Sequence, residues 1–180
     1  PAVFDPVGVG GKFEYRIYQD DILEGLQRLV KEIHGQGIPT GLQLHHGGRQ
    51  ANPDLINGHA VAPSAIPCPV RKFMPRALTI SEIEKIALQY GEYARKAKEV
   101  GFDAVEVHGS HGYLITEFLS PFSNQRTDRY GGSLENRARF PTEVIKEARR
   151  NVGNDFPIFF RIPGEEHVKG GLTKEETSLI

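Results

Sequence analysis

The sequence predicts an α/β fold built on a parallel β-sheet, and three observations support this prediction. Segments with helical periodicity alternate with short β-favouring segments three times along the 180 residues. Successive predicted strands are separated by helices, which is the connection that parallel strands require. With 38% hydrophobic residues, the chain is also long enough to bury one core.

The first helix is predicted from Asp20 to about Ile33, because acidic residues open the segment and glycines 35 and 37 follow it. Its apolar residues recur on one face, which is the pattern of a half-buried helix. That face consists of Ile22, Leu26, Leu29, Val30 and Ile33. A strand is predicted over residues 38–46, IPTGLQLHH, and a long loop follows over residues 47–78.

The second helix is predicted from Thr79 to Val100. Thr79 and Glu82 have the spacing of a capping box, and Gly101 is a typical residue for the end of a helix. The segment DAVEVH, residues 103–108, is predicted to be the next strand.

The third helix is predicted from Leu134 to Val152, with Ser133 as its N-cap. Pro141 lies inside this pattern and is expected to kink the helix or split it in two. The last strand is predicted over residues 156–162, FPIFFRI. A final capping box at residues 173–176 predicts the start of a helix that has too little chain left to form.

Polar side chains occupy one face of each predicted strand. Side chains alternate along a strand, so aliphatic residues share one face and Gln43, Glu106, His108 and Arg161 lie on the other. An unpaired buried polar group costs about 1–3 kcal/mol, so these side chains need partners. Sites in parallel α/β proteins form at the carboxyl ends of strands. The polar residues at or just after those ends are Gln43, His45, His46, His108, His111 and Arg161.

The composition disfavours several classes of function. The net charge is −1 and Lys and Arg form no dominant cluster, so neither nucleic acid nor a membrane surface is expected as a partner. A single cysteine, Cys68, excludes an internal disulfide and predicts a reducing, cytoplasmic location. The chain starts with proline, its single methionine is Met74, and it ends just after the last capping box. These features predict an internal fragment of a longer protein.

Three motifs resemble the Old Yellow Enzyme family of flavin oxidoreductases. They are QLHHGGR at residues 43–49, APSAIP at residues 62–67, and GFDAVEVHGSHGYLITEFLSPFSNQRTDRYGGSLENRARF at residues 101–140. The likeness covers roughly residues 40–161 and is strongest to the bacterial branch with 2-enoate reductase and 2,4-dienoyl-CoA reductase. It implies the middle βα units of an eight-stranded TIM barrel, with the first strand and the last three βα units outside this chain.

The resemblance also implies the cofactor and the residues that act. Both Gln43 and Arg161 would bind FMN. Gln43 would hydrogen-bond the pyrimidine edge of the flavin, and Arg161 would lie near N1 and O2. His108 and His111 would bind the carbonyl oxygen of the substrate, and Tyr113 would donate a proton. The implied reaction takes hydride from NADH or NADPH and reduces the C=C bond of a small enone or enoate. An iron–sulfur cluster and FAD would lie in parts of the parent protein outside this chain.

Other interpretations stay open on the residues alone. One is a metal-dependent TIM-barrel hydrolase that uses the histidines at 45, 46, 108 and 111 with Glu106, whereas the flavin interpretation needs no metal. Another is a catalytically inactive barrel fragment that pairs with a second chain, and a homo-oligomer is compatible with either interpretation. Arg161 could be only an ion-pair partner of Glu106, and Tyr113 could simply pack on Phe118.

Overall fold

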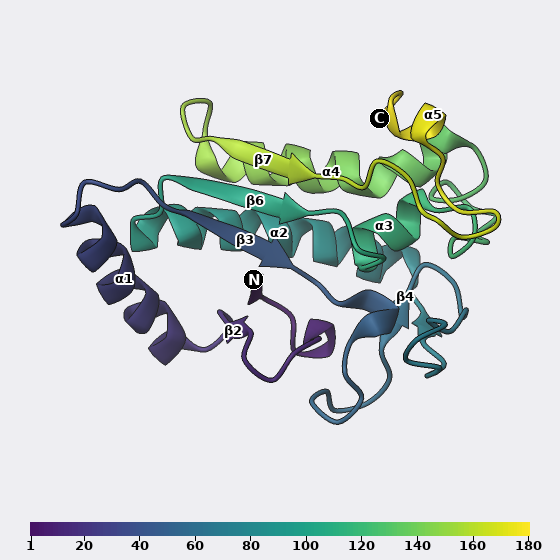
Figure 1. The fold of residues 1–180 in the computed structure, drawn as a ribbon, viewed down its shortest axis with the longest axis horizontal. Helices are drawn as coiled ribbons and strands as arrows, with labels where there is room; N and C mark the ends of the chain where they lie inside the picture. Colours follow the sequence, from purple (N-terminus) through teal and green to yellow (C-terminus); the bar gives the residue numbers. More distant parts are fainter.

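The computed structural model describes residues 1–180 and contains a five-stranded parallel sheet (Figure 1). The strand order is β2-β1-β3-β6-β7. The strands are β1 (Ala2–Val3), β2 (Tyr15–Arg16), β3 (Gly41–His45), β6 (Ala104–His108) and β7 (Ile158–Arg161). Gln43 is paired opposite Glu106, and His108 is paired opposite Arg161. This register brings the four polar residues together toward the carboxyl ends of adjacent strands.

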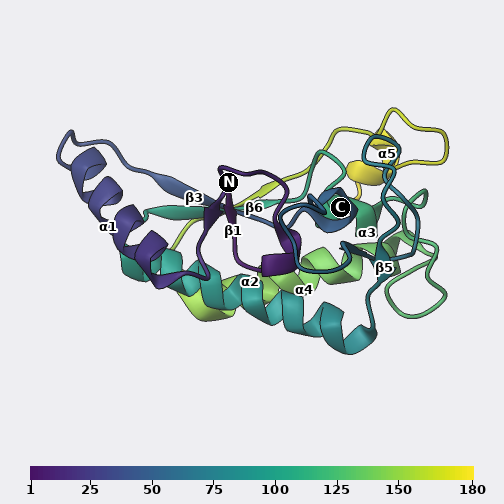
Figure 2. The same cartoon turned by 90° about the horizontal axis from the view of Figure 1, so that it is seen from below.

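Two long helices cover one face of the sheet. Helices α2 (Ile80–Val100) and α4 (Leu134–Val152) lie on the same side of β3 and β6 in both views (Figures 1 and 2). The two helices approach closely at Gly91, where a Cβ atom would lie 2.8 Å from the carbonyl oxygen of Glu147. The core between the helices and the sheet includes Leu44, Tyr90, Val105, Val107 and Phe140, all fully buried.

The predicted helices and their caps are confirmed. At the start of α2, the Thr79 hydroxyl accepts a hydrogen bond from the Glu82 N–H at 3.3 Å, and Glu82 accepts one from the Thr79 N–H at 2.8 Å. Gly101 ends this helix in the left-handed region, with φ +109°. The Ser133 hydroxyl caps α4 by accepting from the Asn136 N–H. The first helix, α1, spans Asp20–His34.

Two expectations about these helices need correction. Of the two outcomes expected for Pro141, a split does not occur, because α4 is one continuous helix and buries the proline. A proline removes one backbone donor, and the buried packing of α4 against α2 maintains the remaining turns. Leu29, predicted to lie on the buried stripe of α1, is 42% exposed, whereas Leu26 is 3% exposed. Helix α1 lies at the edge of the molecule (Figure 1), and its buried residues are Leu26 and Val30.

Several short elements were not predicted. The long loop contains the 3-10 helix η2 (Gly48–Gln50) and two paired strands, β4 (Val61–Ala62) and β5 (Arg76–Ala77). The other short elements are β1, β2, the 3-10 helix η1 (Pro6–Gly8) and helix α3 (Leu114–Leu119). The last capping box does form a helix, α5 (Lys174–Thr177), of a single turn. None of the helices has the length and apolar character that crossing a lipid bilayer requires.

Candidate functional site

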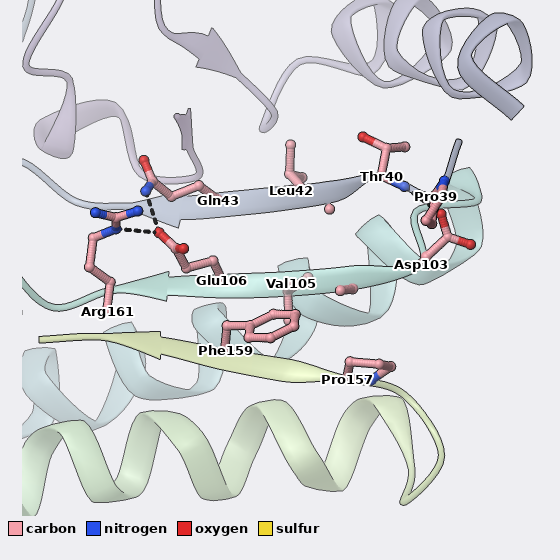
Figure 3. A pocket seen from close by; sticks show the side chains of 12 residues that line it. Pro39, Thr40, Leu42, Gln43, Asp103, Val105, Glu106, Pro157, Phe159 and Arg161 are labelled. Atoms are coloured by element: carbon pink, nitrogen blue, oxygen red, sulfur yellow. Dashed lines mark hydrogen bonds and ion pairs between the residues drawn. The ribbon is translucent and has the colours of Figure 1, made fainter. Parts of the chain in front are cut away.

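The carboxyl ends of β3, β6 and β7 bring together Gln43, Glu106 and Arg161 (Figure 3). The Gln43 amide donates to Oε1 of Glu106 at 2.5 Å, and Nε of Arg161 donates to the same oxygen at 2.9 Å. Partial burial alone would raise the pKa of Glu106, but hydrogen bonds from Arg161 and Gln43 outweigh it and hold the pKa below its usual value. The predicted ion pair between Arg161 and Glu106 is therefore present.

An open recess of about 490 Å³ lies along this face of the sheet. Gln43, Glu106 and Arg161 line its carboxyl end, and Phe159 lines its middle with 60% of its surface exposed (Figure 3). The two terminal nitrogens of Arg161 make no hydrogen bond within the chain, and its side chain is 50% exposed. The recess thus offers guanidinium donors and an amide to a flat polar ligand.

His108 and His111 converge just beyond the end of β6. His108 is the last residue of the strand, and His111 lies in the following turn with φ +62°. Nδ1 of His111 and Nε2 of His108 lie 3.2 Å apart. Burial, and then the nearby His111, lower the pKa of His108 to about 4. His108 is therefore neutral at neutral pH, and Nε2 of His108 and Nδ1 of His111 lie within hydrogen-bond distance of each other, so that one donates and the other accepts.

Tyr113 follows this pair as the N-cap residue of α3. Its ring centroid lies 4.3 Å from that of His45 and 5.3 Å from that of His108. Partial burial raises the pKa of the Tyr113 hydroxyl, so the group stays protonated at neutral pH. The packing of Tyr113 on Phe118 is not found, because Phe118 packs instead against Tyr130 and Phe140.

The adjacent histidines of β3 occupy different surroundings. His45 is 1% exposed beside Tyr113, and neither of its ring nitrogens has a hydrogen-bond partner. Burial, and then His108, lower the pKa of His45 to about 3. His46 turns away from this group: its ring packs near Phe4, and its Nδ1 accepts from the Gly48 N–H at 3.1 Å. The structure therefore places His45 with the site and His46 with the core.

The geometry does not provide the ligand set that the metal-site interpretation requires. No group of three or more His, Cys, Asp and Glu side chains lies close enough to hold one metal ion. His46 is directed away from His108, and Glu106 is engaged by Gln43 and Arg161. His108 and His111 therefore lie close together without a third ligand placed to share a metal ion with them.

Sequence reasoning missed a set of polar residues behind the site. Gln50, at the end of η2, donates from Nε2 to the carbonyl oxygens of His111 and Gly112 at 2.8 and 2.7 Å. Glu117 on α3 is fully buried and accepts from the Arg49 N–H at 2.9 Å. Burial raises the pKa of Glu117 well above its usual value, although Arg49 opposes the shift. Alternation along strands could not reveal these residues, because they lie in a loop and a short helix.

A parallel α/β sheet with polar groups gathered at the carboxyl ends of its strands is an arrangement that TIM barrels share with open doubly wound folds. Residues 2–180 match the NADH:flavin oxidoreductase / NADH oxidase family. The chain belongs to this family, the Old Yellow Enzyme family that the motifs resemble. The family is named for oxidoreductases that use a flavin and NADH.

Individual relatives agree with this assignment. The chain is 44% identical to an NADH oxidase of Thermoanaerobacter brockii over 176 residues, covering 97% of this chain and 27% of the relative. It is 44% identical to an NADPH dehydrogenase of Geobacillus sp. (strain WCH70) over 160 residues, covering 89% of this chain and 46% of the relative. The structure of morphinone reductase in complex with tetrahydroNAD matches with a TM-score of 0.89 at 31% identity, covering 99% of this chain and 53% of that chain. The chain thus spans about half, or less, of the length of these proteins.

The residues present fit FMN. Gln43 and Arg161 extend from β3 and β7, on either side of Glu106. The amide oxygen of Gln43 and the two terminal nitrogens of Arg161 are not used in these contacts, and they match the alternating donors and acceptors of a flavin pyrimidine edge. The guanidinium also brings positive charge, which suits a ring that gains negative charge on reduction.

Proposed function

We propose that the complete protein is an FMN-dependent ene-reductase that takes hydride from NADH or NADPH and reduces the C=C bond of a small α,β-unsaturated carbonyl compound. The observation that carries this proposal is the convergence of His108 and His111 at 3.2 Å, beside Tyr113 and at the same sheet edge as Arg161. Two imidazole donors, one acid and one flavin-binding group of side chains are what this reaction needs.

Gln43 and Arg161 would hold the FMN. The Gln43 amide can both donate to and accept from the pyrimidine ring, while Arg161 donates to its oxygen and nitrogen. When bound, FMN supplies the hydride that the nicotinamide cofactor provides. Glu106 keeps both side chains oriented through its shared oxygen.

His108 and His111 would bind the carbonyl oxygen of the substrate. In the chain alone the two rings hydrogen-bond to each other. A substrate oxygen that replaces this contact would receive one N–H from each ring, and His108, being neutral, can take the tautomer that this requires. Negative charge builds on that oxygen as the β-carbon receives hydride. Loss of one such donor typically costs about 2.7–4 kcal/mol at the transition state.

Tyr113 would then protonate the α-carbon. The hydroxyl remains protonated at neutral pH because burial raises its pKa, and the His45 and His108 rings pack against the phenol. General-acid catalysis of this kind contributes roughly 10²–10⁴-fold. The neutral His45 ring beside it adds no positive charge that would favour the phenolate.

The complete protein is proposed to be longer than these 180 residues. The relatives extend well beyond the matched region, which supports the interpretation of this chain as the internal part of a larger barrel. In a parent of the enoate reductase branch, an iron–sulfur cluster and FAD would lie outside the present residues. We propose a cytoplasmic location, where the reduced thiol of Cys68 would persist.

The test measures the two half-reactions separately in the complete holoenzyme under anaerobic conditions. NADH or NADPH should bleach the flavin absorption, and an enone should restore it. Tyr113→Phe should slow the enone step about 10²-fold or more while flavin reduction stays nearly unchanged. Tyr15→Phe, at an exposed tyrosine, is the matched control and should leave both steps unchanged.

Two outcomes would contradict the proposal. Equal losses in both half-reactions of Tyr113→Phe would remove its role as the acid. A complete protein that is colourless, takes up no FMN and contains stoichiometric metal would remove the flavin function itself.

A further inference from the structure

The turn between β6 and α3 has an unusual backbone at a residue of the proposed site. His111 adopts φ +62°, in the left-handed region that residues with a side chain rarely occupy, and Gly112 follows with φ +71°. This conformation directs the His111 ring toward His108. Because the side chain of His111 is exposed, its own packing does not hold the turn in place.

One side-chain amide holds both peptide groups of this turn. Nε2 of Gln50 donates to the carbonyl oxygens of His111 and Gly112 at 2.8 and 2.7 Å. Only the NH₂ end of the amide can donate twice, so the two contacts also establish the orientation of Gln50. A Cβ atom on Gly112 would lie 2.9 Å from this nitrogen, so the fit depends on glycine.

The segment that carries Gln50 is itself anchored next to the turn. The Leu114 N–H donates to the carbonyl oxygen of His46 at 3.2 Å, and the Arg49 N–H donates to the buried Glu117 carboxylate at 2.9 Å. Gln50 is half-buried, so its amide is partly shielded from water. The turn and the start of α3 are therefore hydrogen-bonded to one segment, residues 46–50.

We propose that Gln50 is a positioning residue for the reaction, which keeps the His111 imidazole beside His108 by capping the left-handed turn. This inference rests on the proposed function, in which His108 and His111 bind the carbonyl oxygen together. Without the amide, the two carbonyls turn to water, the strained conformation of His111 is no longer favoured, and the oxygen keeps a single well-placed donor.

The test uses Gln50→Met in the complete holoenzyme, which keeps the length of the side chain and removes both donors. We expect the enone step to slow about 10- to 100-fold, because displacing a catalytic group by about 1 Å has an effect of that order. The affinity for 4-nitrophenol, whose oxygen should occupy the same donor pair, should fall in parallel. FMN content and the flavin absorption spectrum should be unchanged. Gln36→Met, at an exposed glutamine, is the matched control.

A double-mutant cycle separates positioning through His111 from a general structural role. Adding Gln50→Met to His111→Ala should cause no further loss in the enone step or in phenol binding. A further loss equal to that of the single Gln50 variant would overturn the proposal. Gln50→Glu, which has the same length but no donor at neutral pH, provides a second variant if Gln50→Met does not fold, and wild-type rates in either folded variant would also overturn it.

The same cycle distinguishes this inference from the function on which it rests. If His111→Ala itself leaves both the enone step and 4-nitrophenol binding unchanged, the donor pair of the proposed function fails. If His111→Ala impairs both while Gln50→Met impairs neither, the donor pair stands and the positioning role of Gln50 fails.

Discussion

The two faces of the central sheet come from the same strands but differ in almost every property. On the covered face, Leu44, Val105 and Val107 are fully buried against α2 and α4. On the open face, Phe159 is 60% exposed and the Arg161 side chain is 50% exposed. Because side chains alternate along the strands, one face of the sheet forms the core and the other carries the groups proposed to bind FMN.

The open face changes in character along its length. At its amino end and middle it is an open recess, whereas at its carboxyl end His45 is closed in by Tyr113 and His108. Relatives that are about twice as long supply further chain that can cover the recess, which supports the view that it is the interior of a larger barrel. Substitutions on the two faces should therefore have very different effects in these 180 residues.

The largest expected effect is that of a charge introduced on the covered face. Val105→Asp buries an unpaired carboxylate at a fully buried position, so the 180-residue chain should lose about 4 kcal/mol or more of stability, or fail to fold. Phe159→Asp is the matched change on the next strand, at an exposed position, and should cost about 1 kcal/mol or less. Urea unfolding followed by circular dichroism measures both.

Similar losses of stability for the two variants would show that Phe159 is covered in solution. Two copies of the chain that cover each other's recess would have this effect. In the complete protein, by contrast, a covered recess predicts that Phe159→Asp becomes strongly destabilising. Comparing Phe159→Asp in the 180-residue chain and in the complete protein therefore tests whether further chain covers the open face.

A second prediction concerns the closed end of the open face. Burial lowers the pKa of His45 to about 3 in the folded chain, while an unfolded chain titrates near 6.5. The unfolded state therefore binds the proton more readily, and stability that is present above about pH 6.5 is lost as the pH falls toward 3. At pH 5 the loss due to His45 should be about 2 kcal/mol relative to pH 7.5.

His45→Phe removes this titration. Its free energy of unfolding should therefore depend less on pH between 7.5 and 5, by about 2 kcal/mol, in urea unfolding at each pH. His59→Phe, at an exposed histidine, is the control and should keep the pH dependence of the parent chain. An unchanged pH dependence in His45→Phe would mean that water reaches this ring.

The sequence predicted the elements whose causes are local. The capping box and the terminal glycine of α2 mark helix ends through contacts three or four residues apart, and both were found where expected. The last capping box was expected to stop short of a helix, but it begins the single turn α5. Strand alternation likewise predicted which side chains share the open face. Two-residue strands such as β1 carry no periodicity, so pattern alone could not reveal them.

The missed features depend on contacts between distant parts of the chain. Gln50 acts on backbone atoms 61 and 62 residues away, and nothing in its neighbours announces this. The burial of His45 depends on Tyr113, which meets it only after β3 and β6 pair. Local reasoning also allowed Pro141 to split the third helix, whereas tertiary packing keeps α4 continuous.

The smallest expected effect on stability is that of Arg161→Gln. Its ion pair with Glu106 is half-exposed, and exposed pairs contribute about 1 kcal/mol or less, so unfolding of the 180-residue chain should change by no more than that. FMN binding in the complete protein should instead weaken by about 10- to 100-fold, because a charge-assisted hydrogen bond is lost. Flavin fluorescence titration measures the affinity. A large loss of stability with unchanged FMN affinity would make Arg161 a structural partner of Glu106, and the open face would then lose its strongest link to the flavin.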